Sequence, residues 1–210
     1  RRMKRIAVLA SGRGSNFQAV IDAIRQGSIP AECVGLVSDN PGAYAITRAR
    51  SAGIPVFIVD YSRYSTKDEY EADLLRVMKS LHADLFVLAG YMRILGAGIV
   101  REFPGKLINI HPALLPSFAG LHAQRQAIEY GVRVSGCTVH FVDEGVDTGP
   151  IIVQSCVPVL PGDDEESLSE RILKEEHRCL PRAIRAFCED RIRVSGRRVS
   201  IVGEDSAPPA

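Results

Sequence analysis

The stretch IAVLASGRGSN, residues 6–16, decides the class of fold. Its first half, Ile6–Ala10, is a short continuous apolar run of the kind found in strands that are buried on both faces. A glycine turn follows, and the sequence then predicts a helix from Asn16 to Gln26. A strand, a tight turn and a helix in this order begin a βαβ unit, so the stretch predicts an α/β protein.

The same alternation continues up to residue 111. Apolar runs predict further strands at Cys33–Ser38, Pro55–Val59, Asp84–Ala89 and Lys106–Ile110. Amphipathic segments between them predict helices at Ala43–Ser51, Thr66–Leu81 and Ala97–Phe103. Because alternating strands and helices build a mainly parallel sheet, we expect a Rossmann-like three-layer fold.

The pattern changes after residue 111. Two predicted strands, Cys137–Val142 and Pro150–Val157, are separated by a segment too short for a crossover helix, so the sheet is expected to end in an antiparallel portion. The other predicted elements are a loop at Leu114–Gly120, helices at His122–Glu129 and Asp164–Cys188, and a hairpin of Ile192–Ser195 and Val199–Val202. Pro181 is expected to kink or interrupt the longer helix.

Length and composition predict a single domain over residues 1–210, with frayed ends at 1–3 and 204–210. The formal net charge is +1, so nothing suggests an electrostatic field for nucleic acid or an anionic membrane. Five cysteines without a C-x-x-C pair argue against a disulfide framework or a thiolate zinc site and favour a reducing compartment. No apolar run approaches the roughly 20 residues of a membrane span, so we expect a cytoplasmic protein.

The glycine turn is a candidate phosphate site. Glycines let successive N–H groups point into one concavity, and the start of the next helix adds partial positive charge around Gly14, Ser15 and Asn16. Ser15 and Asn16 are also suitable N-cap residues. A dinucleotide-binding turn needs a third glycine where Phe17 stands, so a mononucleotide or sugar phosphate is favoured. Taken alone, the turn fits an ordinary strand–helix connection equally well.

Asn109 and His111 stand at the end of the fifth predicted strand, in the segment Asn109-Ile110-His111-Pro112. Side chains alternate along a strand, so these two point the same way, toward the edge of the sheet where ligands of open α/β folds bind. An amide can donate to a developing oxyanion, and an imidazole can move a proton near neutral pH. On these residues alone, polar groups satisfied by loop backbone are the stronger interpretation.

Acidic residues complete the candidates. The segment Asp143–Pro150 holds three carboxylates, and one placed near His111 would raise the pKa of its imidazole and keep a proton donor present at neutral pH; a solvated acidic loop is the alternative. Glu176 falls inside an apolar helical stripe, which favours a ligand contact or an internal ion pair with an arginine. His140, in an apolar strand, is interpreted as a structural core histidine.

Together these segments resemble the folate-dependent formyltransferases. The matching stretches lie in the family's order over most of the chain: Ala10–Asn16, Leu88–Leu95, Ile108–Gly120, Gly136–Pro150 and Glu175–His177. The resemblance implies direct transfer of the formyl group of 10-formyltetrahydrofolate to the amino group of glycinamide ribonucleotide, in purine synthesis and without a metal. The partners would be these two small molecules, with no nucleic acid and no membrane, and the protein would be a monomer or a homodimer.

The resemblance also implies roles for individual residues. Asn109 would hold the formyl oxygen, His111 would donate to the oxyanion of a tetrahedral intermediate, and Asp147 would fix the charge of His111 and help to move protons. The ribonucleotide would be bound by Gly14, Ser15, Asn16 and Glu176. Folate would be bound by Lys67, Met92, Arg93, Ile94, Leu95, Asn109, Asp143, Glu144, Gly145, Val146 and Asp147.

Two positions depart from the family's common pattern. Lys67 replaces an arginine and cannot form the two parallel hydrogen bonds of a guanidinium, and Gln124 replaces a histidine.

Three other functions are alternatives to this one. Methionyl-tRNA formyltransferases usually add a carboxyl-terminal RNA-binding domain, and formyltetrahydrofolate deformylases, which use water, usually carry an amino-terminal regulatory domain. A non-catalytic folate- or nucleotide-binding module would leave Asn109, His111 and Asp147 idle.

Overall fold

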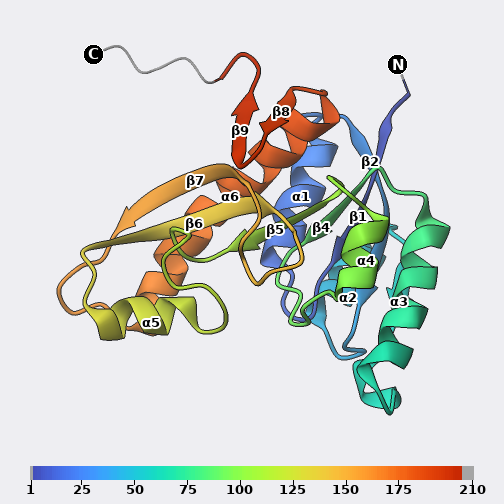
Figure 1. Ribbon diagram of the computed structural model, residues 1–210, viewed down its shortest axis with the longest axis horizontal. Coiled ribbons are helices and arrows are strands. Elements are labelled where there is room, and N and C mark those ends of the chain that lie inside the picture. Colours follow the sequence, from blue (N-terminus) through green and yellow to red (C-terminus); the bar gives the residue numbers. More distant parts are fainter. Residues whose placement is uncertain (1, 205–210) are drawn as a thin grey trace.

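The computed structural model describes residues 2–204, in which a seven-stranded sheet is covered by helices on both faces (Figure 1). The strand order is β3-β2-β1-β4-β5-β6-β7. The strands of this sheet are β1 Lys4–Leu9, β2 Ala31–Ser38, β3 Val56–Ile58, β4 Leu85–Leu88, β5 Leu107–His111, β6 Val134–Phe141 and β7 Ile151–Pro158. A separate two-stranded hairpin consists of β8 Ile192–Ser195 and β9 Arg198–Ile201.

The helices lie where the amphipathic segments predict them, with small shifts at their ends. They are α1 Ser15–Arg25, α2 Tyr44–Ser51, α3 Lys67–Leu81, α4 Ala97–Glu102, α5 Ala123–Tyr130 and α6 Glu165–Cys188, with a 3-10 turn η1 at Tyr61–Arg63. Local capping sets several boundaries. Thr66 accepts a hydrogen bond from the N–H of Glu69 at the start of α3, and Asp164 and Ser167 form a capping box at the start of α6.

The parallel part of the sheet reverses its direction of growth between β1 and β4. β1 pairs in parallel with both β2 and β4, and β4 pairs in parallel with β5. Because the chain leaves β1 and β4 toward opposite sides, a crevice opens beyond their carboxyl ends, which is the usual ligand site in such sheets. The glycine turn after β1 and the segment 89–96 after β4 both reach this place.

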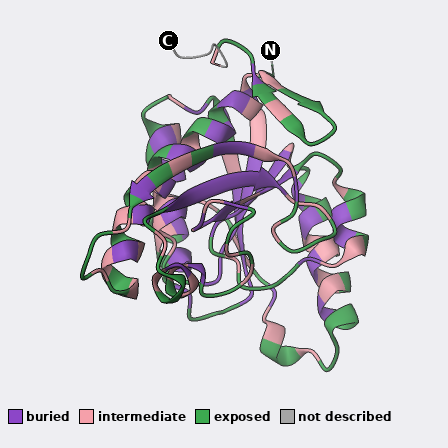
Figure 2. Ribbon diagram, turned by 60° about the vertical axis from the view of Figure 1, so that its left-hand side comes forward, coloured by how far each residue is buried: buried purple, intermediate pink, exposed green. Residues whose placement is uncertain are grey.

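Two apolar clusters cover opposite faces of the sheet. In β1, Ile6 and Val8 belong to the cluster that includes α1, α2 and α6, while Ala7 and Leu9 belong to the cluster that includes α3 and α4. This is the period-two pattern of a strand buried on both faces, and Figure 2 shows the strands of the sheet largely buried. The predicted three-layer α/β fold is therefore confirmed.

The antiparallel end of the sheet is also confirmed, since β6 pairs antiparallel with both β5 and β7. The register places Asn109 opposite His140 and His111 opposite Thr138. Residues directly opposite one another in an antiparallel pair share a face of the sheet. Asn109, His111 and His140 therefore project from one face, at the end of β5.

The local structure differs from the predictions at two places. Pro181 does not interrupt α6, because side chains beside it such as Leu180 and Ala183 are fully buried and keep the helix packed on the sheet. The N-cap of α1 is Gly14 rather than Ser15 or Asn16, and no side chain caps this helix. Gly14 has a φ of +75°, and an added Cβ would lie 2.8 Å from the Cβ of Ala45, so both backbone shape and space favour glycine.

The described ends of the chain are held by ion pairs. Arg2 Nη2 lies 2.8 Å from Asp84 Oδ1, and Glu204 pairs with Arg182 at 2.9 Å and with Arg191 at 3.4 Å. Residue 1 and residues 205–210, which belong to the ends expected to fray, lie outside the described residues. None of the helices within residues 2–204 combines the length and the apolar character that crossing a bilayer requires.

Candidate active site

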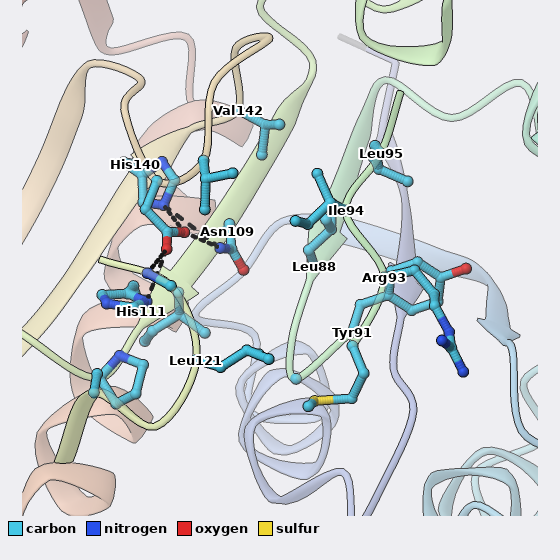
Figure 3. Close-up of a pocket in the computed structure, with 18 of the residues that line it drawn as sticks. Leu88, Tyr91, Arg93, Ile94, Leu95, Asn109, His111, Leu121, His140 and Val142 are labelled. Carbon is cyan, nitrogen blue, oxygen red and sulfur yellow. Dashed lines mark hydrogen bonds and ion pairs between the residues drawn. The ribbon is translucent and has the colours of Figure 1, made fainter. Parts of the chain in front are cut away.

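A cavity of about 460 Å³ lies at the carboxyl ends of β4 and β5 (Figure 3). We call it the switch-point cavity, because it lies beside the place where the sheet reverses its direction of growth. Its walls come from the segments 88–95, 109–112, 120–124 and 140–147, together with side chains of α1 and α6. Residues far apart in sequence thus meet around one space.

Ser11 in the glycine turn ties this turn to the segment that follows β4. Its N–H donates to the carbonyl of Gly90 at 3.1 Å, and its hydroxyl accepts from the N–H of Met92 at 2.8 Å. Arg93 faces outward: its Nε lies 2.9 Å from Asp39 Oδ2 and its guanidinium lies 3.7 Å from the centre of the Tyr61 ring. In Figure 3 the guanidinium accordingly points away from the polar side of the cavity, so Arg93 presents mainly its backbone there.

Three residues predicted to be catalytic meet on the polar side of the cavity. Asp147 Oδ2 lies 3.4 Å from His111 Nδ1 and accepts a 2.8 Å hydrogen bond from the N–H of Gly120. Its other oxygen, Oδ1, lies 3.5 Å from Asn109 Nδ2 and 3.6 Å from His140 Nε2. The structure therefore brings Asn109, His111 and Asp147 together, with His140 as a fourth member.

Asp147 is held in an ionised state. Its φ is +55°, a left-handed conformation that aspartate tolerates better than most residues and that turns its carboxylate toward the histidines. Burial alone would raise the pKa of Asp147, but contacts with His140, the Gly120 N–H and His111 together outweigh it and lower the pKa. Asp147 therefore carries its negative charge at neutral pH.

His111 behaves differently from the sequence-based expectation. Its Nε2 donates to the carbonyl of Phe118 at 2.8 Å, and its Nδ1 faces Asp147. Burial lowers the pKa of His111 and outweighs the Phe118 carbonyl and Asp147, which both act to raise it. The predicted net rise is therefore wrong, although Asp147 acts in the predicted direction. At neutral pH the unliganded imidazole is neutral, with its proton on Nε2.

His140 is a member of this cluster that the sequence pattern does not reveal. The residue is buried on β6, and its Nδ1 donates to the Phe141 carbonyl at 2.8 Å, which leaves Nε2 facing Asp147 and Asn109. A histidine in an apolar strand is usually part of a core. The signal that identifies it here is the β5–β6 register, which places it opposite Asn109 and which one strand's pattern does not contain.

Glu176 lies inside the apolar stripe of α6, as predicted, and is only 7% exposed. Its partner is not an arginine: Asn16 Nδ2 donates to Glu176 Oε1 at 3.2 Å. Burial raises the pKa of Glu176 to about 7, and the bond from Asn16 opposes this only partly. Asn16 Oδ1 is buried and has no hydrogen-bond partner among the described residues.

Of the three residues predicted to bind phosphate, Asn16 lines the cavity, whereas Gly14 and Ser15 do not. The first turn of α1 has N–H groups that no carbonyl within the helix can accept, as in every helix. Arg48 Nε donates to the carbonyl of Arg13 at 2.8 Å, which places a guanidinium beside the turn. The turn thus offers backbone donors and a cation close to the cavity, which suits a phosphate.

The residues predicted to contact folate divide into two groups. Met92, Ile94 and Val146 line the cavity and are 60%, 59% and 44% exposed, so they form an apolar wall that is open to solvent. Further lining residues from the prediction are Arg93, Leu95, Asn109, Asp143, Gly145 and Asp147, and Gln124 also lines the cavity. Lys67 and Glu144 lie outside the lining: Lys67 is 4.0 Å from Glu71, and Glu144 is 2.6 Å from Arg101.

A family model described as "Formyl transferase" matches residues 4–184. The chain belongs to the formyl transferase family. The matched range contains every residue that lines the switch-point cavity of this formyl transferase, together with the whole seven-stranded sheet.

Similar curated proteins fall into two groups. The phosphoribosylglycinamide formyltransferase of Haemophilus influenzae is 41% identical over 202 residues, which cover 96% of this chain and 95% of that protein. The trifunctional purine biosynthetic protein adenosine-3 of Drosophila melanogaster is 54% identical over 185 residues, which cover 87% of this chain. This formyl transferase spans only 14% of the length of the Drosophila protein.

Solved structures agree on the fold. The glycinamide ribonucleotide transformylase 1 of Symbiobacterium toebii is 50% identical, with a TM-score of 0.92 over 95% of this chain and 94% of that one. A formyltetrahydrofolate deformylase of Pseudomonas syringae is 30% identical, with a TM-score of 0.89 over 95% of this chain and 66% of that one. The fold is therefore shared with a transformylase and with a deformylase.

Proposed function

We propose that this formyl transferase moves the formyl group of 10-formyltetrahydrofolate to the amino group of glycinamide ribonucleotide, a step of de novo purine (IMP) synthesis. The observation that carries the proposal is the meeting of Asn109, His111 and Asp147 in one cavity that also contains Glu176 and the segment 91–95. Similarity to proteins named for this activity supports it.

The reaction asks the protein for charge stabilisation and proton movement. The neutral amine attacks the formyl carbon, a new C–N bond forms, and negative charge develops on the formyl oxygen. The old C–N bond then breaks, the leaving folate nitrogen takes up one proton, and the attacking nitrogen loses one. Since the protons balance, the site needs an oxyanion donor and a relay rather than a covalent intermediate.

Asn109 and His111 supply the donors. Among the residues that the structure describes, Asn109 Nδ2 makes only long contacts of 3.5 Å, to Asp147 and His140, so its amide is free to bind the formyl oxygen more closely. His111 Nε2 donates to the Phe118 carbonyl in the unliganded protein. In the complex the developing oxyanion replaces this carbonyl as the acceptor, and the bond becomes stronger because its acceptor is charged.

Asp147 compensates for the burial of His111. The low pKa of His111 keeps the imidazole neutral before the reaction, and a proton that reaches it makes a buried cation. The ionised carboxylate 3.4 Å away stabilises that cation at the moment when it forms and assists the transfer of a proton between the two nitrogens. His140 and the Gly120 N–H hold Asp147 in place for this role.

The two substrates bind to different parts of the site, the ribonucleotide phosphate at the glycine turn beside the cavity and the folate on the apolar wall. The N–H groups at Gly14, Ser15 and Asn16 bind the ribonucleotide phosphate, and Glu176 contacts the same substrate. The apolar wall of Met92, Ile94 and Val146 binds the folate ring system, together with Leu95, the backbone of Arg93 and the loop from Asp143 to Asp147. Lys67 and Glu144, which lie outside the cavity lining, stay predicted folate contacts.

Three further expectations stay predictions: a reaction without a metal, a monomer or homodimer, and a cytoplasmic location. For the metal, no group of three or more His, Cys, Asp or Glu side chains within residues 2–204 is arranged to hold an ion. The chemistry above requires none, because Asn109 and His111 already provide the oxyanion donors.

A deformylase is the second candidate, because Asn109, His111 and Asp147 would serve a water acceptor equally well and a deformylase shares the fold. Glu176, Asn16 and the turn beside Arg48 favour the transferase, since water needs no binding site of this kind.

The test is an assay of the purified protein with 10-formyltetrahydrofolate, with and without glycinamide ribonucleotide. Tetrahydrofolate formed only with the ribonucleotide supports transfer. Formation without it supports the deformylase, and ligand binding without turnover indicates a binding module.

A further inference from the structure

The loop that carries Asp147 is fastened from outside the cavity by two arginines that the proposed mechanism does not use. Arg101 on α4 forms a two-pronged ion pair with Glu144, with Nε–Oε1 and Nη2–Oε2 distances of 2.6 and 3.3 Å. Arg197, at the tip of the β8–β9 hairpin, donates from Nη2 to the carbonyl of Thr148 at 2.7 Å. The two contacts hold opposite arms of the loop.

The arm held by Arg197 is the one that sets the position of Asp147. Thr148 follows Asp147 directly, and its hydroxyl donates to Asp143 Oδ1 at 2.5 Å. The next residue, Gly149, is closely packed, because an added Cβ would lie 1.7 Å from the carbonyl oxygen of Phe141. With Thr148 fixed at both its hydroxyl and its carbonyl, the backbone of Asp147 has little freedom to leave its φ of +55°.

The hairpin reaches this arm across a second cavity. The hairpin lies beside the start of β7 (Figure 1), and between the two is a space of about 460 Å³. Val142 and Pro150 line it from the loop side, and Ile192 and Val194 line it from the hairpin side. Since packing is open here, a polar contact across the gap matters more for the loop than it would over a filled interface.

We propose that Arg197 is a positioning residue, which holds Thr148 and thereby keeps the Asp147 carboxylate against His111 for formyl transfer. Arg101 holds the other arm, which contributes to folate binding. The expected effect of Arg197 on kcat rests on the proposed function, whereas its expected effect on the position of Asp147 does not. Loss of the Arg197 contact lowers kcat, because Asp147 leaves His111, whereas loss of the Arg101 contact raises KM for the folate.

The test compares Arg197→Ala with Arg197→Lys, Arg101→Ala and Arg198→Ala. Arg198 is the matched control, because it is exposed on the same hairpin and, within residues 2–204, no hydrogen bond or ion pair joins its side chain to the loop. We expect Arg197→Ala to lower kcat about fivefold with little change in KM, the effect of losing one exposed charged hydrogen bond. Arg197→Lys keeps one cationic donor and restores most of the rate, and Arg198→Ala behaves as the unmodified protein.

A second readout does not depend on turnover. The charge of Asp147 acts to raise the pKa of His111, so Arg197→Ala should lower the pKa of this imidazole in an NMR titration, and Arg198→Ala should leave it unchanged. An unchanged His111 titration in Arg197→Ala overturns the positioning role. Equal kcat in Arg197→Ala and Arg198→Ala, or no rescue by lysine, overturns it as well. If the unmodified protein transfers no formyl group, the proposed function fails, and the titration still decides the role of Arg197.

Discussion

Two carboxylates, the half-buried Asp147 and the buried Glu176, face the switch-point cavity and have opposite properties. Asp147 has polar contacts with two histidines and accepts a hydrogen bond from the N–H of Gly120, and its pKa is lowered. Glu176 has one hydrogen bond, from Asn16, and its pKa is raised to about 7. Burial acts to raise both values, but it is more complete at Glu176, and at Asp147 the polar partners outweigh it, so burial and partners together set the difference.

The difference divides the cavity into two chemical regions. Around Asp147 the protein maintains a negative charge that can stabilise a transient imidazolium on His111. Around Glu176 the side chain gains or loses its proton near neutral pH, so it can either donate to or accept from a bound polar group. We infer that the first region serves the reaction and the second serves recognition of the ribonucleotide, as the proposed function requires.

The largest expected effect comes from removing the charge of Asp147. Asn tolerates a φ of +55° and has the same shape, so Asp147→Asn changes charge with little change in backbone. We expect kcat to fall by about 100-fold or more, comparable with the loss of an oxyanion donor, and His111→Ala to act similarly. Thermal melting should change little. Near-normal turnover in both variants would show that the cluster is not the reaction centre.

The next effect is a pH dependence of the free energy of unfolding that arises from Glu176. A pKa raised from 4.5 to about 7 means that the folded state holds the proton more tightly than the unfolded chain does. Its stabilising contribution is therefore complete below pH 4.5 and is lost as pH rises to about 7, by about 3 kcal/mol in total.

The variant Glu176→Gln lacks this dependence. Relative to the unmodified protein, its Tm should rise by about 10 °C between pH 4.5 and pH 8, as expected for a chain of this length. Melting curves of both proteins across this range measure it. A Tm difference that does not change with pH would mean that Glu176 is ionised throughout, and the contrast with Asp147 would disappear.

A smaller effect is expected for His140, which supports Asp147 from β6. Replacing it by asparagine removes the contact to Asp147 Oδ1 and leaves that oxygen with only Asn109 nearby. We expect kcat to fall about tenfold, the usual result when one partner of a buried charged group is lost, with KM nearly unchanged. A rate loss as large as that of Asp147→Asn would assign His140 a direct part in the reaction instead.

The smallest effect is expected at the glycine turn. Ser15→Ala leaves the N–H groups of the first turn of α1 in place and removes one hydroxyl. We expect KM for the ribonucleotide to rise about fivefold and kcat to stay the same. Steady-state kinetics with each substrate varied in turn measures this. A change confined to the KM of the folate would show that the turn belongs to the other substrate.

The sequence predicts most of the fold because the pattern is local. The alternation of apolar strands and amphipathic helices specifies the layers, and helical spacing places Glu176 on the buried face of α6. Strand alternation likewise puts Asn109 and His111 on one side. The role of His140 depends on how β5 and β6 are aligned, a non-local property that neither strand encodes by itself.

The predictions for the pKa of His111 and for the effect of Pro181 on α6 fail for the same reason. The charge of Asp147 suggests a raised pKa for His111, but burial, which the sequence does not show, has the larger effect. Similarly, Pro181 removes one hydrogen bond from α6, but the buried side chains on either side hold the helix together. In both cases the packing of distant segments outweighs a correctly identified local effect.

The most direct test of the contrast is a ¹³C NMR titration of the side-chain carboxyl groups in the unliganded protein, with Asp147→Asn and Glu176→Gln used to assign the two resonances. We predict that Glu176 titrates with a midpoint near pH 7, while the Asp147 resonance stays that of a carboxylate down to below pH 4. If both groups titrate together in the ordinary range near pH 4, the division of the cavity into a charged and a neutral region is contradicted.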